Sequence, residues 1–129
     1  ARARRAPCLA IDTETVADPD APIAVDPMRS RLVGVSIAVA PGEAYYLPFA
    51  HRLADGAGNL ALLSGDAGIA GRRITAGLTE PVNLPPLDDP RLAPLRALLE
   101  DPDVPKVAQN AKYDVLILRG AGVTLRGLV

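Results

Sequence analysis

Three segments in the first half of the chain alternate between apolar and polar residues or form short apolar runs. Residues 7–14, PCLAIDTE, are an apolar run that ends in polar residues, and residues 31–40, RLVGVSIAVA, place a valine or isoleucine at every second position. Residues 44–49, AYYLPF, follow the turn residues Pro41 and Gly42. A period of two is typical of β-strands, so the sequence predicts three strands, of which the last two form a hairpin.

The second half of the chain has helical spacing. Residues 88–102 carry leucines three and four positions apart, which predicts a helix with one apolar face. Residues 104–109, VPKVAQ, predict a short strand, and residues 110–122, NAKYDVLILRGAG, predict a second helix with Asn110 as its N-cap. Residues 123–125, VTL, predict the beginning of another strand.

This order of elements predicts an α/β fold: a mixed sheet in which three antiparallel strands lead into βαβ crossovers. Residues 52–86 contain six glycines and no sustained period, and we expect them to form an insertion. Residues 1–6, ARARRA, predict a linker or arm. Because the chain ends at Val129 just after a predicted helix, we expect residues 1–129 to be one C-terminally incomplete domain.

The composition of the chain argues against several classes of protein and of binding site. The formal net charge of the chain is −1, whereas a dedicated binder of duplex DNA usually has a basic excess. Contacts with nucleic acid must therefore be local or come from other domains. The single cysteine excludes an internal disulfide and a zinc site with several cysteines, and no segment is long and apolar enough to predict a membrane span.

Two acids end the first predicted strand. Asp12 and Glu14 are two positions apart, so their side chains share one face of the strand. Adjacent carboxylates repel each other, and a hard divalent cation such as Mg²⁺ or Mn²⁺ relieves that repulsion. The sequence therefore predicts a cation site here, with hydration of both acids at an exposed strand end as the alternative.

Asp114 is a second candidate acid. It lies four residues after Asn110, so both share one face of the second predicted helix. A carboxylate near the start of a helix is also favoured by the helix dipole alone. Because the residues that follow, VLIL, predict a largely buried helix, Asp114 is a candidate to face an active site. His51, the only histidine, is a candidate base, although its position at the end of the hairpin favours a framework role.

Three stretches carry a family resemblance: LAIDTET, RLVGVSIAVAPGEAYYLPFAH and LLEDPDVPKVAQNAKYDVLILRGAGVTLRG. Together they resemble the 3′–5′ exonuclease (proofreading) domain of bacterial DNA polymerase I, over nearly the whole chain except residues 16–25 and 52–86. DTET resembles the first exonuclease motif, and NAKYD, with its N-x-x-x-D spacing, resembles the second. GEAYYLPFAH favours polymerase I over other exonucleases.

The resemblance implies an RNase H-like fold and hydrolysis of the 3′-terminal phosphodiester of single-stranded DNA. Two divalent metal ions, Mg²⁺ or Mn²⁺, serve as cofactors in that scheme. It implies that Asp12 bridges both ions, that Glu14 binds one of them, and that Asp114 holds the second largely through water. It further implies a role in DNA replication and repair, in the bacterial cytoplasm with the nucleoid.

The resemblance also implies residues that bind the substrate. Thr13 would offer its backbone near the terminal nucleotide, and Asn110 and Tyr113 would frame the single-stranded end. An apolar residue in the loop after DTET would wedge against the terminal base, and Val25 is the candidate for that role.

The family's third motif, a Tyr and an Asp on a later helix, has no counterpart before the end of the chain. We therefore expect the chain alone to bind metal weakly and to have little activity. The resemblance implies a polymerase domain of the same full-length chain as a partner, and no membrane. Two alternatives are an RNase D-like exonuclease acting on RNA and a non-catalytic, exonuclease-like structural domain, against which the presence of all three acids argues.

Overall fold

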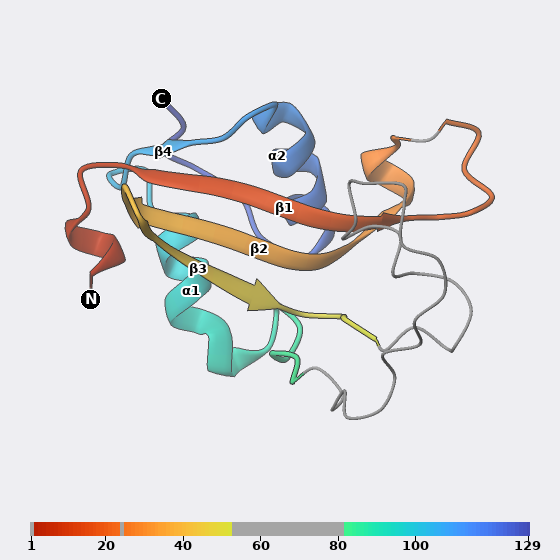
Figure 1. Ribbon diagram of the computed structural model, residues 1–129, viewed down its shortest axis with the longest axis horizontal. Helices are drawn as coiled ribbons and strands as arrows, with labels where there is room; N and C mark the ends of the chain where they lie inside the picture. The colour runs from red at the N-terminus through yellow and green to blue at the C-terminus, as the bar shows by residue number, and fades with distance from the viewer. Residues whose placement is uncertain (1, 24, 53–81) are drawn as a thin grey trace, which may run out of the picture.

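The computed structural model describes residues 2–23, 25–52 and 82–129 (Figure 1). In chain order the elements are the 3₁₀ helix η1 (Ala3–Arg5), β1 (Leu9–Ala17), η2 (Pro27–Arg29), β2 (Ser30–Ala40), β3 (Glu43–Pro48), η3 (Pro90–Leu92), α1 (Ala93–Leu99), β4 (Lys106–Val107) and α2 (Ala111–Gly120). The strands form one sheet in the order β3-β2-β1-β4, with β1, β2 and β3 antiparallel and β4 parallel to β1. The predicted α/β class and mixed sheet are confirmed.

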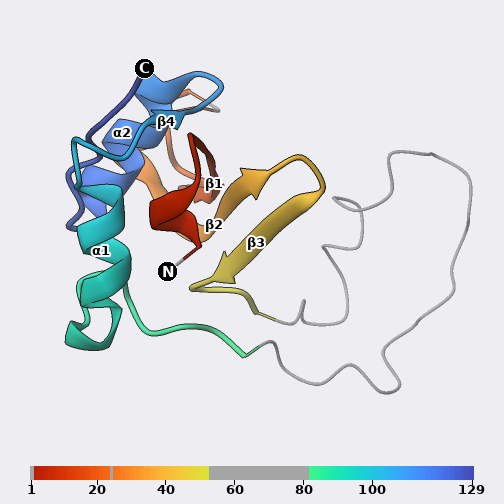
Figure 2. The same ribbon diagram turned by 90° about the vertical axis from the view of Figure 1, so that its left-hand side faces the viewer.

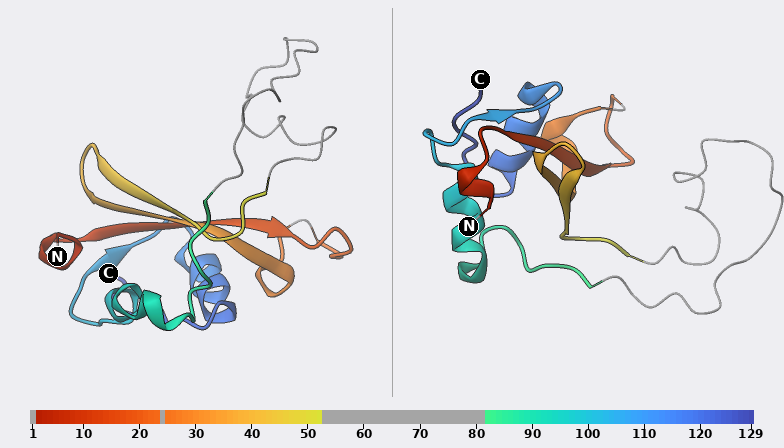
Figure 3. Two further views of the ribbon diagram at one scale, coloured as in Figure 1. Left: turned by 90° about the horizontal axis from the view of Figure 1, so that it is seen from below. Right: turned by 60° about the vertical axis from the view of Figure 1, so that its left-hand side comes forward.

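Both α-helices lie on one face of the sheet, which we call the inner face (Figures 2 and 3). Within the described ranges no helix covers the opposite face, the outer face. The core between sheet and helices is aliphatic and consists of Leu9, Ile11, Val35, Ile37, Val39, Leu87, Leu98, Leu99, Val104, Leu118, Val123 and Leu125. In this part of the chain no helix is both long and apolar enough to cross a membrane.

The first predicted helix is divided into η3 and α1. Asp89 caps η3, and its carboxylate accepts a hydrogen bond from the backbone N–H of Arg91 at 2.9 Å. Pro94 lies in the first turn of α1, where no intrahelical N–H bond is needed. Leu98 and Leu99 are buried, as the leucine spacing predicts.

The predicted strand does not begin at residues 123–125, and the chain pairs with β4 only three residues later, where Leu128 forms a parallel bridge with Lys106. The N–H of Val123 donates to the carbonyl of Leu118 in α2 at 2.9 Å, and the N–H of Arg126 donates to the carbonyl of Leu99 in α1 at 3.1 Å. These bonds tie the segment to the ends of both helices. Val123 and Leu125 are buried there. The apolar alternation of residues 123–125, which is typical of a strand, therefore belongs to an irregular segment of the core.

The predicted arm at residues 1–6 contains η1 and two ion pairs. Arg2 Nη2 lies 2.7 Å from Glu43 Oε2, at the start of β3, and Arg4 Nη1 lies 2.8 Å from Asp101 Oδ2, after α1. Both arginine side chains are about half exposed or more, so water and salt screen each pair strongly. The pairs thus position this segment without adding much stability.

Most of the predicted insertion at residues 52–86 lies outside the described residues. Near its two ends, His51 and Asn83 form a reciprocal pair: the N–H of His51 donates to Asn83 Oδ1, and Asn83 Nδ2 donates to the carbonyl of His51, both at 2.8 Å. The N–H of Leu84 donates to the carbonyl of Pro48 at 2.7 Å. The chain therefore leaves the sheet and returns to it at the end of β3.

Candidate active site

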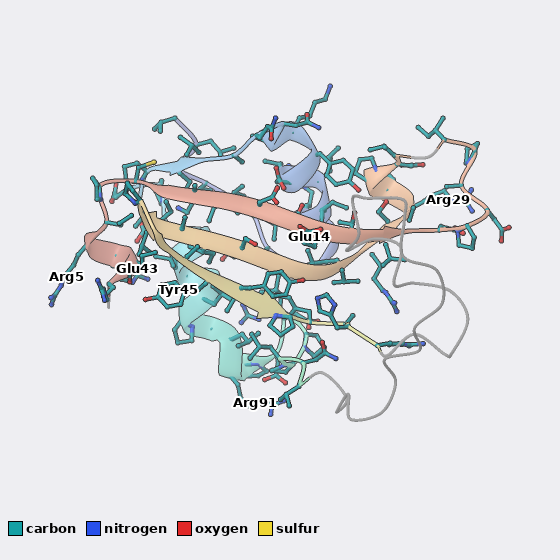
Figure 4. The ribbon with its side chains drawn as sticks, in the orientation of Figure 1. Arg5, Glu14, Arg29, Glu43, Tyr45 and Arg91 are labelled. Atoms are coloured by element: carbon teal, nitrogen blue, oxygen red, sulfur yellow. The ribbon has the colours of Figure 1, made fainter. Side chains whose placement is uncertain are left out.

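Asp12 and Glu14 project from the outer face of β1, where Figure 4 labels Glu14. Their neighbour Ile11 points to the inner face and is buried, so the alternation that predicts a shared face for the acids holds in the structure. Across the sheet Asp12 is opposite Ser36, and Glu14 is opposite Gly34. The register shifts directly after Glu14, and irregularities of this kind are common next to active sites.

The third predicted acid lies elsewhere. Asp114, on the first turn of α2, is only 3% exposed, and its Oδ1 accepts hydrogen bonds from the backbone N–H of Thr13 at 3.1 Å and from Thr13 Oγ1 at 2.6 Å. β4 pairs only with Leu9 and Ala10 of β1, which leaves the edge of β1 at Thr13 open to this carboxylate. The two bonds satisfy a buried acid that would otherwise be costly.

The positions of the three acids determine whether they can bind a metal ion together. Asp12 and Glu14 offer carboxylate oxygens on one exposed strand face, which suits a hard divalent cation. However, among the described residues no group of three or more His, Cys, Asp and Glu side chains is placed to hold a metal ion. The outer-face pair therefore fits one part of a cation site, while the third acid of the predicted set, Asp114, uses its Oδ1 to bond Thr13.

Tyr113 and Thr13 both take part in holding α2 against β1. The hydroxyls of Tyr113 and Thr15 are 2.9 Å apart and hydrogen-bonded, one residue along from the Asp114–Thr13 bonds. The predicted role of Thr13 near a nucleotide used its backbone, whereas in the structure its N–H is directed at Asp114. We call this set, Thr13, Thr15, Tyr113 and Asp114, the α2 latch.

Asn110 occupies the N-cap position of α2 but does not act as a cap. Its backbone is left-handed, with φ 55° and ψ 44°, and its side chain makes no capping hydrogen bond. A capping side chain needs an extended backbone, whereas asparagine tolerates the left-handed region better than most residues. The predicted N-cap position is confirmed, but the side-chain bond of a typical cap is absent, and the exposed amide stands at the start of α2.

Val25 lies in the loop between β1 and η2 and is 66% exposed. Ile23 and Met28 in the same loop are 59% and 76% exposed. Asp18 and Arg29 hold the base of the loop, since Arg29 Nη2 lies 2.7 Å from Asp18 Oδ2. A backbone hydrogen bond from Asp20, followed by the guanidinium of Arg29, lowers the pKa of Asp18. The loop thus presents Val25 to solvent together with two other apolar side chains.

Tyr46 was not among the predicted site residues, yet the register places it beside them. Asp12, Ser36 and Tyr46 form one row across β1, β2 and β3, so all three point to the outer face. The Tyr46 hydroxyl is hydrogen-bonded to His51 Nε2. Partial burial and the charge of Glu14 raise the pKa of Tyr46, which keeps the hydroxyl protonated. Strand alternation in the sequence separates Tyr46 from Tyr45 but does not reveal the register.

A hollow of about 750 Å³ lies away from these residues. It is bounded by η2, the beginning of β2, Phe49 and the second half of α2, including Arg119. None of the predicted site residues lines it. The acids and the hollow are therefore separate features of the molecule.

Solved structures share the fold at low sequence identity. "Brucella melitensis NrnC bound to pGG" aligns with a TM-score of 0.54 and 18% identity, covering 97% of this chain and 41% of that one. "POL domain of Pol1 from M. smegmatis complex with DNA primer-template and dNTP" aligns with a TM-score of 0.54 and 19% identity, covering 98% of this chain and 15% of that one. These neighbours confirm the predicted RNase H-like fold.

Sequence comparison identifies the family. The DNA polymerase I of Rhizobium leguminosarum is 37% identical over 135 residues, and that of Chloroflexus aurantiacus is 34% identical over 127 residues. Each alignment covers 98% of this chain, but the chain spans only 11% and 10% of the two relatives. The profile of the 3′–5′ exonuclease family matches residues 1–129. The chain therefore belongs to the 3′–5′ exonuclease family, in the form found in bacterial DNA polymerase I.

Proposed function

We propose that the chain is part of the proofreading exonuclease of a DNA polymerase I, which hydrolyses the 3′-terminal phosphodiester of single-stranded DNA. The observation that carries this proposal is the pair Asp12 and Glu14 on an exposed strand face, within a chain that matches the exonuclease family over residues 1–129. The partner implied is a polymerase domain in the same natural protein, acting in DNA replication and repair in the bacterial cytoplasm.

Asp12 and Glu14 are the residues that would hold divalent cations through their carboxylates. Mg²⁺ or Mn²⁺ ions bound there supply an activated water and neutralise charge on the scissile phosphate. Without a cation, two carboxylates on one strand face repel a phosphate, so the pair alone disfavours DNA. Asp114 belongs to the proposed set as well: its Oδ1 is engaged by the N–H and hydroxyl of Thr13, so Oδ2 is the oxygen that would bind a cation.

The residues around the acids bind and orient the single strand in this proposal. The exposed amide of Asn110 donates to sugar or phosphate oxygens, and Tyr113 keeps the first turn of α2 against β1 through its bond to Thr15. Val25, in its exposed apolar loop, contacts the terminal base, whose ring is unstacked in a single strand. Thr13 acts by positioning Asp114.

A second candidate is an exonuclease for RNA of the RNase D type. The fold similarity to NrnC, with a TM-score of 0.54, is compatible with it. The identities of 34–37% to DNA polymerases I favour the first proposal. A non-catalytic structural domain is disfavoured because Asp12, Glu14 and Asp114 are all retained.

The test uses the natural gene product that contains this chain, with 5′-labelled DNA and RNA single strands of one sequence and Mg²⁺. We expect stepwise shortening of DNA from the 3′ end and its loss in Asp12→Ala. Asp103→Ala, a change at an exposed acid outside the proposed site, is the control and should leave the rate unchanged. Preferential digestion of RNA would support the second candidate, and equal DNA digestion by Asp12→Ala would refute the proposal.

A further inference from the structure

The outer face carries an aromatic residue next to the two acids. In one row across the sheet Asp12, Ser36 and Tyr46 are neighbours, and in the next row Gly34 lies between Glu14 and Pro48. Opposite residues in adjacent antiparallel strands are about 4.5–5.5 Å apart at Cβ, so Tyr46 is two such steps from Asp12, with Ser36 between them.

Tyr46 leans from its own row onto Gly34. A Cβ atom at Gly34 would overlap the Tyr46 hydroxyl and would lie 2.8 Å from Tyr46 Cε2. The absence of a side chain at this position therefore gives the ring its place. Because Gly34 is opposite Glu14, the hydroxyl stands over the residue next to that acid. Partial burial raises the pKa of Tyr46, and the charge of Glu14 raises it further, which agrees with this proximity.

The hydroxyl end of Tyr46 is fixed. Its hydroxyl is bonded to His51 Nε2, and the two rings are 5.5 Å apart at their centroids and tilted by 59°. The backbone of His51 is in turn held by the two 2.8 Å bonds to Asn83. Tyr46 remains 46% exposed. The result is a fixed aromatic ring with an open side, at the border of the acid pair.

We propose that Tyr46 is a further substrate-binding residue of the exonuclease site, which contacts the terminal nucleotide of a single strand lying over Asp12 and Glu14. This inference rests on the proposed function. A chain with a net charge of −1 has little electrostatic attraction for DNA, and aromatic contact with bases is the other main source of single-strand affinity.

The other aromatic residues are placed differently. The chain contains three tyrosines, one phenylalanine and no tryptophan. Tyr45 is opposite Ile37, which faces the core, and its hydroxyl bonds Glu43 at 2.6 Å (Figure 4). Phe49 packs against the core, and Tyr113 belongs to the α2 latch. Tyr46 is thus the aromatic residue that the register places on the outer face.

The first test measures exonuclease kinetics of the natural gene product on a short oligothymidylate. Tyr46→Ala should raise KM about fivefold to a hundredfold, the range of one lost base–aromatic contact, with kcat changed less than about twofold. Tyr45→Ala, a change of the same residue type on the same strand, is the matched control and should leave KM unchanged. Equal KM values for the two variants would overturn the inference.

Gly34→Ala gives an independent test, because its new Cβ displaces the Tyr46 ring without changing that residue. Gly34→Ala should raise KM as Tyr46→Ala does, and the double variant should be no worse than either single variant. Additive effects on KM would overturn the inference. Circular dichroism and melting curves of each variant separate displacement of the ring from loss of the fold.

A spectroscopic readout avoids catalysis. Since the chain lacks tryptophan, Tyr46→Trp introduces a single fluorophore on the outer face of the 129-residue chain, and Tyr45→Trp introduces one on the other side. With Mg²⁺ present to neutralise Asp12 and Glu14, oligothymidylate should quench the first and leave the second unchanged; equal responses would overturn the inference. If Asp12→Ala abolishes exonuclease activity while both tyrosine positions respond alike, this inference fails and the proposed function stands.

Discussion

The outer face of β1 and the α2 latch treat their carboxylates in opposite ways. Asp12 and Glu14 project from a strand face that no described helix covers, whereas Asp114 is buried and takes two hydrogen bonds from Thr13. The exposed pair has charge available for a ligand, whereas one oxygen of the buried acid, Oδ1, already accepts two hydrogen bonds within the fold. Acids that a family pattern treats as one set can therefore contribute differently to stability and to binding.

The largest expected effect is on activity. In the natural gene product, Asp12→Ala should reduce exonuclease activity by about a hundredfold to a thousandfold or more, as when one group that stabilises transition-state charge is lost. Its melting temperature should stay the same, because Asp12 is exposed. A measurable fall in melting temperature for Asp12→Ala would mean that the outer-face acid also has a structural role, and the comparison would break down.

Asp114→Ala, unlike Asp12→Ala, should lower the stability of the fold. The variant leaves the N–H of Thr13 without its acceptor, so unfolding in denaturant should show a loss of about 1–3 kcal/mol. Thr13→Val keeps the backbone bond and removes the hydroxyl bond, so a smaller loss of about 1 kcal/mol is expected. Unchanged stability in Asp114→Ala would show that the latch does not hold α2 in solution.

Metal titration sharpens the same contrast. The 129-residue chain should bind Mn²⁺ weakly, with a dissociation constant on the order of millimolar, because two carboxylates on one strand are an incomplete ligand set. Asp12→Ala should abolish this binding, and Asp114→Asn should leave it nearly unchanged. If Asp114→Asn removes binding as well, the three acids come together in solution in spite of the Thr13 bonds.

The smallest effect concerns Asp89, a carboxylate near the surface that is structural. Hydrogen bonds from the Arg91 side chain and backbone lower the pKa of Asp89 to about 2 from an ordinary value of 3.8. The ionised form is thus favoured by folding, so its stabilising effect is present above pH 3.8 and is lost as the pH falls towards about 2. Melting temperatures of the natural sequence and Asp89→Ala should differ slightly at pH 7 and converge near pH 2.

The sequence predicts much of this architecture because β1, β2, α1 and α2 each repeat one period over several residues. The shared face of Asp12 and Glu14 follows from alternation alone. The partner of Asp114 does not, since it depends on β4 ending opposite Ala10, a long-range event that no local pattern encodes. The position of Tyr46 on the outer face, opposite Ser36, depends in the same way on the register between β2 and β3.

Two local predictions failed for local reasons. Asn110 stands at the predicted cap position, but its backbone is left-handed rather than extended, and its side chain makes no capping bond to α2. Residues 123–125 carry the alternation of a strand, but the N–H of Val123 bonds the carbonyl of Leu118 in α2 and the N–H of Thr124 bonds Glu100 Oε1. In both cases residue type predicts the environment correctly and the hydrogen-bond partner incorrectly.

The reciprocal amide bonds between His51 and Asn83 have a consequence for how this domain can vary between species. They close a loop in the chain, so the number of residues between His51 and Asn83 can change without altering the distance between these two residues. The entropic cost of closing such a loop rises only slowly with its length, by about 0.6 kcal/mol for each doubling. Insertions and deletions between residues 51 and 83 are therefore expected to leave the outer face and its acids in place.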